Sequence, residues 1–320
     1  MSLEENLAAL SLDELADAAY RLGLRLPGRT GRAKYTSAII DSLASPEPLA
    51  DALGYSRAQT LMHFLSTQRR RTVRFGRHPR LDQACAALTD FGLATCDEQS
   101  WHILAEARVL CSLKPEQENA LREREALITT AEGWLRLYGM LPLEELEARM
   151  QTGQPEELLR VWGCVFGMRG FYSFQHQTWL LHPIVEMPEG LLMAVTADGM
   201  RDIPFAPFAD ADRQSAAVTG LPQRGRALEF CRSLYTEELI SSGLMLMVSV
   251  MLQKRGLRDA AELLMALPKT GARIPSIEQA LVRSCLEHFP QWQYKGYSAA
   301  EMTAMRRRLN PPSPPGRPLN

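Results

Sequence analysis

The chain has 320 residues, of which 46% are hydrophobic and 23% charged, values typical of a globular protein long enough for two or three small domains. The formal net charge is −1, and the longest apolar run, 244–252, is far shorter than the roughly 20 residues that a membrane-spanning helix needs. The acidic first residues do not resemble a signal peptide. Six cysteines without Cys-x-x-Cys spacing argue against zinc-knuckle and thioredoxin-type sites and predict reduced thiols in a cytoplasm.

Two helices are predicted within the first 45 residues. Ser11 and Glu14 have the spacing of a capping box, and Gly23 suits the end of that helix. A second helix is expected over about 32–43. The connection and the start of the second helix carry cations and no acid, and these are predicted nucleic-acid ligands: Arg25, Arg29, Arg32 and Lys34.

This helix–extended–helix pattern resembles the SAP and Rho-N-terminal-like family of small nucleic-acid-binding modules. The resemblance rests on Leu12-x-x-Leu15, Leu22-Gly23-Leu24 and Gly31-Arg32-x-Lys34, and it covers about 33 residues. It implies that Arg29, Arg32 and Lys34 contact the phosphate backbone. The alternative is a small helical hairpin that only docks on its neighbour.

The most basic segment follows, at 69–80, where RRRTVRFGRHPR holds six arginines, one histidine and no acid. The whole span 21–80 has a net charge of +9, so the rest of the chain has −10. A segment this basic predicts a polyanion as partner, and the alternative is a solvated arginine loop. Its predicted ligands are Arg69, Arg70, Arg71, Arg74, Arg77 and Arg80.

The middle of the chain contains an internal repeat, in which 92–101 (GLATCDEQSW) aligns with 170–179 (GFYSFQHQTW). A helix is predicted before each aligned stretch and a β-hairpin within it, and we call each such unit of helices and hairpin a copy. This order resembles a winged helix-turn-helix, a family that binds DNA with its third helix and wing, although many members only join proteins. Copy one is predicted to have helices at 56–67 and 81–91 with a strand at 72–75. Copy two is predicted to have helices at 121–138, 143–150 and 156–168 and strands at 171–174 and 178–181.

Charge distinguishes the two copies. Residues 64–82 of copy one have a net charge of +5, whereas the aligned residues 142–160 of copy two have −3. Phosphates are attracted to the first surface and repelled by the second. Copy one is therefore predicted to bind nucleic acid and copy two to be a spacer or a protein-contact domain.

Beyond residue 183 we expect a strand pair, 191–196 and 202–205, and then helices at 227–234, 236–254, 258–267 and 276–288. Ser298 and Glu301 form a capping box for a last helix, 299–309, before a loose proline-rich tail. The stretch Trp292-x-x-Lys295-Gly-Tyr-Ser resembles the ending of a group of uncharacterised bacterial proteins that also begin with a Rho-N-like module. Some members carry a terminal cysteine-rich metal motif, which this chain lacks.

No motif in the chain is typical of catalysis or of a cofactor. His176 and His182 flank the second hairpin, but a histidine pair without a further ligand does not predict a metal site. Four loop aspartates, at 198, 202, 210 and 212, could bind metal or perform acid–base chemistry, and an enzyme acting through this loop is the last alternative, because loop acids are more often turn formers.

The sequence therefore predicts a mainly α protein with small β-hairpin wings, built from a SAP/Rho-N-like helical hairpin, two winged-helix-like units and a C-terminal helical domain. The predicted function is non-enzymatic nucleic-acid binding, of DNA in preference to RNA, in the cytoplasm, with no cofactor, metal or membrane partner. The alternative is an interaction scaffold whose arginines contact an acidic protein, with a protein partner at 111–185 or the C-terminal helices. The predicted segments are 1–45, 46–110, 111–185, 186–226, 227–309 and 310–320.

Overall fold

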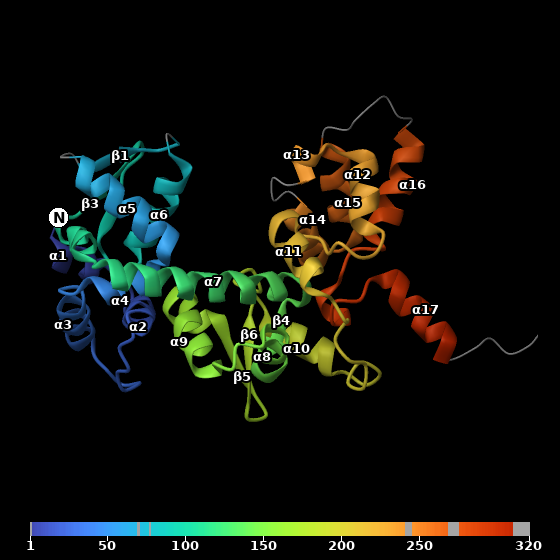
Figure 1. The fold of residues 1–320 in the computed structure, drawn as a ribbon, viewed down its shortest axis with the longest axis horizontal. Helices are drawn as coiled ribbons and strands as arrows, with labels where there is room; N and C mark the ends of the chain where they lie inside the picture. Colours follow the sequence, from blue (N-terminus) through green and yellow to red (C-terminus); the bar gives the residue numbers. More distant parts are fainter. Residues whose placement is uncertain (1, 69–70, 77, 241–244, 268–274, 310–320) are drawn as a thin grey trace, which may run out of the picture. The chain divides into compact units, whose positions relative to one another are not determined.

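The structure, a computed structural model, describes residues 2–68, 71–76, 78–240, 245–267 and 275–309. The chain is mainly helical and has two small antiparallel sheets (Figure 1), which confirms the predicted fold class. The predicted tail at 310–320 and three predicted ligands, Arg69, Arg70 and Arg77, lie outside the described residues.

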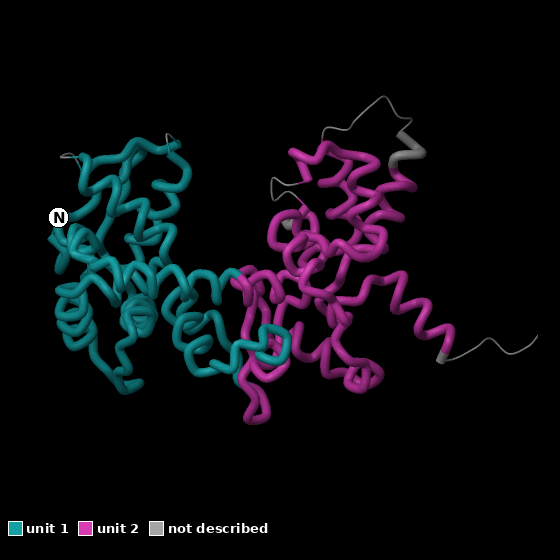
Figure 2. The backbone as a smooth tube through the Cα atoms, viewed as in Figure 1, with its two compact units in different colours: residues 1–129, 147–173 teal, residues 130–146, 174–320 magenta. Residues whose placement is uncertain are grey.

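Two compact units make up the chain (Figure 2). Unit 1 consists of residues 1–129 and 147–173, and unit 2 of residues 130–146 and 174–320. In unit 1 a single hydrophobic core runs from Leu3 to Leu121, so the predicted segments 1–45 and 46–110 share one core.

The N-terminal helices are α1 (Leu3–Ala9), α2 (Leu12–Arg21) and α3 (Arg32–Ser42). The predicted capping box of α2 is present, because Ser11 Oγ accepts the N–H of Glu14 and the Glu14 carboxylate accepts the N–H of Ser11. Helix α1 was not predicted, although Ser2 and Glu5 form the same motif. Asn6, on α1, donates to the Gly92 carbonyl at 2.8 Å, which ties this end of the chain to the first repeat copy.

The first repeat copy follows directly. Its strands form a sheet in the order β1-β3-β2, so β1 is an edge strand. The two predicted helices and the predicted strand are confirmed. The elements are α4 (Pro46–Leu53), α5 (Tyr55–Thr67), β1 (Thr72–Arg74), α6 (Pro79–Thr89), β2 (Ala94–Cys96), β3 (Ser100–Ile103) and the 3₁₀ helix η1 (Ala105–Ser112).

The second copy has the matching sheet order, β4-β6-β5, so the repeat extends to topology. One element has no counterpart: helix α8 lies between β4 and α9, whereas only residues 75–78 separate β1 from α6. Membership of the winged-helix family stays a prediction. The elements are α7 (Pro115–Tyr138), β4 (Met140–Pro142), α8 (Leu143–Met150), α9 (Pro155–Phe166), η2 (Gly167–Gly170), β5 (Phe171–Phe174) and β6 (Gln177–Leu181).

The remaining chain is helical, and its last helices enclose a second core. The predicted strand pair is wrong, because 191–196 belongs to a helix in which Leu192 and Val195, three residues apart, are buried while Met193 is exposed. No strand is formed at 202–205. The elements are α10 (Pro188–Thr196), α11 (Asp210–Thr219), α12 (Ala227–Leu234), α13 (Glu237–Leu239), α14 (Met245–Arg255), α15 (Leu257–Ala266), α16 (Pro275–Leu286), η4 (Trp292–Tyr294) and α17 (Ala299–Leu309).

The Trp292-x-x-Lys295-Gly-Tyr-Ser stretch is a structural anchor within unit 2. Lys295 is buried, and its Nζ donates to the carbonyls of Ile203 at 2.7 Å and Arg201 at 3.2 Å. Burial lowers the pKa of this ammonium group. The predicted capping box follows, since Ser298 and Glu301 exchange backbone-to-side-chain hydrogen bonds at the start of α17.

Candidate nucleic-acid interface

The described part of the arginine-rich segment forms the edge strand β1 and the turn into α6. Val73 pairs with Trp101 of β3 and is buried, while its neighbours Thr72 and Arg74 are exposed. The strand therefore holds Arg74 in solvent by anchoring Val73 in the core.

A single carboxylate orders the turn after β1. Asp82, in the first turn of α6, accepts the N–H of Gly76 at 2.9 Å through Oδ2 and the indole N–H of Trp101 at 3.2 Å through Oδ1. Gly76 has a φ of +74°, which glycine adopts without strain. The ring of Phe75 lies edge-to-face with Trp101 at 5.1 Å between centroids and is 39% exposed. The sequence left open whether Phe75 anchors the core, and the structure places it at the surface.

A groove of about 1130 Å³ lies beside this strand, between α5, β1 and the start of α6. Its described lining includes two arginines and two histidines and contains no acidic residue. The N-terminal end of α6, which faces the same groove, carries partial positive charge. We call this groove the basic groove. Its described lining residues are Thr60, His63, Phe64, Thr67, Gln68, Thr72, Val73, Arg74, His78, Pro79, Arg80 and Leu81.

Three of the predicted arginine ligands in this segment are described, and all three are exposed. Arg74 and Arg80 line the basic groove, and Arg71 immediately precedes β1. None of the three forms an ion pair with a residue in the described part of the chain. Their charges are therefore available to an anionic partner.

The wall that α5 contributes to the basic groove was not predicted. Thr60, His63, Phe64 and Thr67 follow one another at helical spacing, so they share one face of α5. The sequence contained a signal for this wall, because one face of the predicted helix has two threonines, a histidine and a phenylalanine in place of the aliphatic residues that usually face a core.

The predicted N-terminal ligands lie elsewhere in unit 1. Figure 1 shows the connection between α2 and α3 at the opposite end of unit 1 from β1 and α6. Two of these cations serve internal contacts: Arg25 lies 4.1 Å over the Tyr20 ring, and Arg32 donates to the Leu10 carbonyl at 2.6 Å, just beyond α1. Arg29 and Lys34 are exposed. The segments that carry the described members of the two sets therefore lie at different ends of unit 1.

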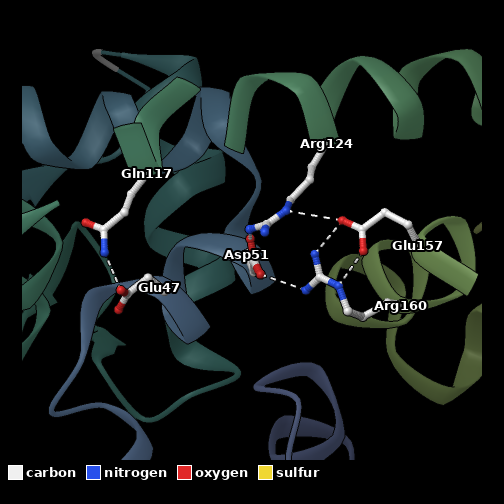
Figure 3. A network of polar contacts seen from close by, with 6 residues as sticks. All are labelled: Glu47, Asp51, Gln117, Arg124, Glu157 and Arg160. Atoms are coloured by element: carbon white, nitrogen blue, oxygen red, sulfur yellow. Dashed lines mark hydrogen bonds and ion pairs between the residues drawn. The ribbon is translucent and has the colours of Figure 1, made fainter. Parts of the chain in front are cut away.

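The second repeat copy uses its third helix, α9, for internal packing in unit 1. In Figure 3, Asp51 of α4 accepts hydrogen bonds from Arg124 of α7 at 2.6 Å and from Arg160 of α9 at 3.0 Å. Glu157 accepts two hydrogen bonds from Arg160, which lowers the pKa of this carboxyl group. Figure 3 also shows a separate contact between the same two helices, α4 and α7, in which Gln117 donates to Glu47. Helix α9 also packs against α2, so part of its surface is covered.

Two of the four loop aspartates make contacts within the fold, and the two histidines differ in burial. Asp212 is buried, accepting the N–H groups of Ala209 at 2.9 Å and Arg224 at 2.6 Å, and Arg213 lowers the pKa of Asp210. His176 lies in an exposed turn, whereas His182 is buried. Within the described residues, no group of three or more His, Cys, Asp or Glu side chains could hold a metal ion.

No protein-family model, curated protein or solved structure matches this chain. Among the described residues, no helix combines the length and apolar character required to cross a membrane.

Proposed function

We propose that the chain is a non-enzymatic nucleic-acid-binding protein, with DNA preferred over RNA, and that unit 1 binds the nucleic acid in the basic groove. The observation that carries this proposal is the groove lining, in which the described residues include Arg74, Arg80, His63 and His78 and no acid. Phosphates bound there would displace counterions, and the exposed Arg71 adds a third arginine beside the groove.

The packing of the second copy supports the same division of roles. Its third helix is engaged with α2 and α4, and its first strand, Met140–Pro142, is buried throughout. In the first copy, by contrast, Thr72 and Arg74 of the corresponding strand are exposed. We infer that α9 of the second copy stabilises unit 1 and that the first copy meets the nucleic acid.

A cytoplasmic location is part of the proposal. It is supported by the cysteines, since all six are free thiols, including Cys231 and Cys285, whose sulfurs are 3.7 Å apart. Cell fractionation with an antibody to the native chain checks this location, and recovery from an oxidising compartment would contradict it.

The function is tested with an Arg71/Arg74/Arg80→Ala variant and fluorescein-labelled single-stranded and hairpin-duplex DNA and RNA, using anisotropy at low salt. We expect wild-type binding, a loss of roughly tenfold or more in the variant, and a slope of log K against log salt that is shallower by about 2 to 3. The matched control is Arg306/Arg307/Arg308→Ala, which removes three exposed arginines from α17 in unit 2.

Two outcomes would overturn the proposal. The first is the absence of wild-type binding to every nucleic acid at low salt. The second is an equal loss in both triple variants, since that result would reflect net charge alone. Polyglutamate serves as a competitor: if it displaces nucleic acid as effectively as unlabelled DNA of equal charge, the acidic-protein scaffold is favoured instead.

A further inference from the structure

The lining of the basic groove is apolar as well as cationic. Four of its residues are apolar: Val73 and Leu81, which are largely buried, Phe64, which is half-buried, and Pro79 at the start of α6. An anion alone gains nothing from these side chains, so the ligand that fits has apolar faces as well as phosphates.

The faces of nucleic-acid bases meet this requirement only when they are free. In a duplex the bases are stacked on one another, and a protein meets phosphates and base edges. In a single strand the base faces are available and stack on aromatic and apolar side chains, while the phosphates lie along cations. The size of the groove is also suitable, since about 1130 Å³ exceeds the roughly 300–1,000 Å³ of a small-molecule pocket.

An aromatic pair includes the residue that follows the groove-lining strand β1 in the sequence. Phe75 directly follows the lining residue Arg74, and its ring is 39% exposed while Trp101 supports it edge-to-face. An exposed ring that a second aromatic residue and Asp82 hold in place is a surface on which a base can stack without first ordering the side chain.

We propose that the basic groove binds single-stranded nucleic acid in preference to duplex, with bases against the apolar part of its lining, above all the half-buried Phe64, and on Phe75. The lining residues Arg74 and Arg80 bind the phosphates. This inference rests on the proposed function and specifies the strandedness of its ligand.

The test compares a fluorescein-labelled 12-nucleotide oligo-dT, the matching oligo-rU and a 12-base-pair hairpin duplex at one salt concentration. We expect either single strand to bind at least tenfold more tightly than the duplex. Phe75→Ala should weaken single-strand binding by about fivefold to a hundredfold, the range for loss of one stacked base, and Phe75→Trp should retain it.

A variant that fills the groove tests whether single-strand binding depends on the space in the groove as well as on its cations. Thr60→Trp places a large side chain in the α5 wall and removes no cation, so single-strand binding should fall at least tenfold while duplex binding stays within about twofold. Circular dichroism checks that the variant is folded. If Thr60→Trp is not folded, the effect of Phe75→Ala on single-strand binding decides whether the inference holds, because the Phe75 ring is exposed and lies outside the buried core.

The outcomes distinguish this inference from the proposed function. Duplex binding as tight as single-strand binding, or wild-type single-strand affinity in both Phe75→Ala and Thr60→Trp, overturns the inference and leaves nucleic-acid binding in place. Failure of all the nucleic acids to bind overturns both.

Discussion

Arginines that look alike in the sequence have different roles in the structure. Arg21 contributes to the basic span, yet it is buried and donates to Asp90 at 2.6 Å and to the Ala52 carbonyl at 3.2 Å. Arg32 satisfies carbonyls at the end of α1, whereas Arg74 is free to meet a ligand. Formal charge is readable from the sequence, but exposure depends on which residues the fold brings close, so only part of the +9 span faces solvent.

His182 provides a prediction at the same scale. It is buried in unit 2, its Nδ1 accepts the N–H of Ile184, and its Nε2 lies 3.9 Å from a Glu132 oxygen. Burial, with a smaller effect from Arg136, lowers its pKa to about 3, so burial outweighs the nearby Glu132 carboxylate. In the unfolded chain the imidazole has a pKa of about 6.5.

As pH falls below 6.5, the unfolded chain therefore binds a proton at this position before the folded protein does, and stability is lost. The expected loss from His182 is about 2 kcal/mol between pH 7 and pH 5, at about 1.4 kcal/mol per pH unit below 6.5. Urea unfolding of the wild type and of His182→Asn at both pH values measures it. Between pH 7 and pH 5 the free energy of unfolding of the variant should fall by about 2 kcal/mol less than that of the wild type. An identical pH dependence of the two proteins would contradict a lowered pKa of His182.

At the scale of elements, structures that depend on neighbouring residues could be predicted from the sequence, whereas packing between distant segments could not. The capping boxes at Ser11 and Ser298 and the β5–β6 hairpin depend on neighbouring residues and were predicted. Residues 191–196 show a continuous apolar run that suits either a buried strand or a helix, and their helical structure becomes evident only from which side chains are buried. The arginines of the basic groove were predicted from charge, whereas its α5 wall depends on how α5 packs against α6.

The Asp51 network of Figure 3 makes a testable contribution to the packing of α4, α7 and α9 in unit 1. Asp51→Asn removes a carboxylate shared by two arginines, and we expect unfolding to become easier by about 1–2 kcal/mol. The cost stays below the 3–5 kcal/mol of a fully buried pair because Arg124 and Arg160 are partly exposed and can turn to water.

Urea unfolding followed by tryptophan fluorescence measures this change. Glu47→Gln is the matched control on the same helix, α4, since Glu47 is exposed and its partner on α7 is a neutral amide. This control should change stability by less than about 0.5 kcal/mol. Equal effects of the two substitutions would show that the shared carboxylate has no special role.

At the scale of the whole chain, the predicted ligands that the structure describes come from two separate segments of unit 1. The group between α2 and α3 lies at the opposite end of unit 1 from β1 and α6 (Figure 1). An Arg29→Ala/Lys34→Ala variant should therefore bind the 12-nucleotide oligo-dT within about twofold of the wild type, because distant sites act independently. A loss as large as that of the groove variant would instead mean that one strand contacts both ends of unit 1.

The two hydrogen bonds that Asp82 accepts, from Gly76 and Trp101, have a consequence for the free energy of ligand binding. Because one carboxylate joins the turn at Gly76, the start of α6 and Trp101 of β3, residues on both sides of the turn keep their relative positions before any ligand arrives. A loop without this tie would lose conformational freedom on binding, and that loss would subtract from the affinity. In this fold the ordering of the anchored residues takes place during folding, so the ligand meets a surface that is already arranged.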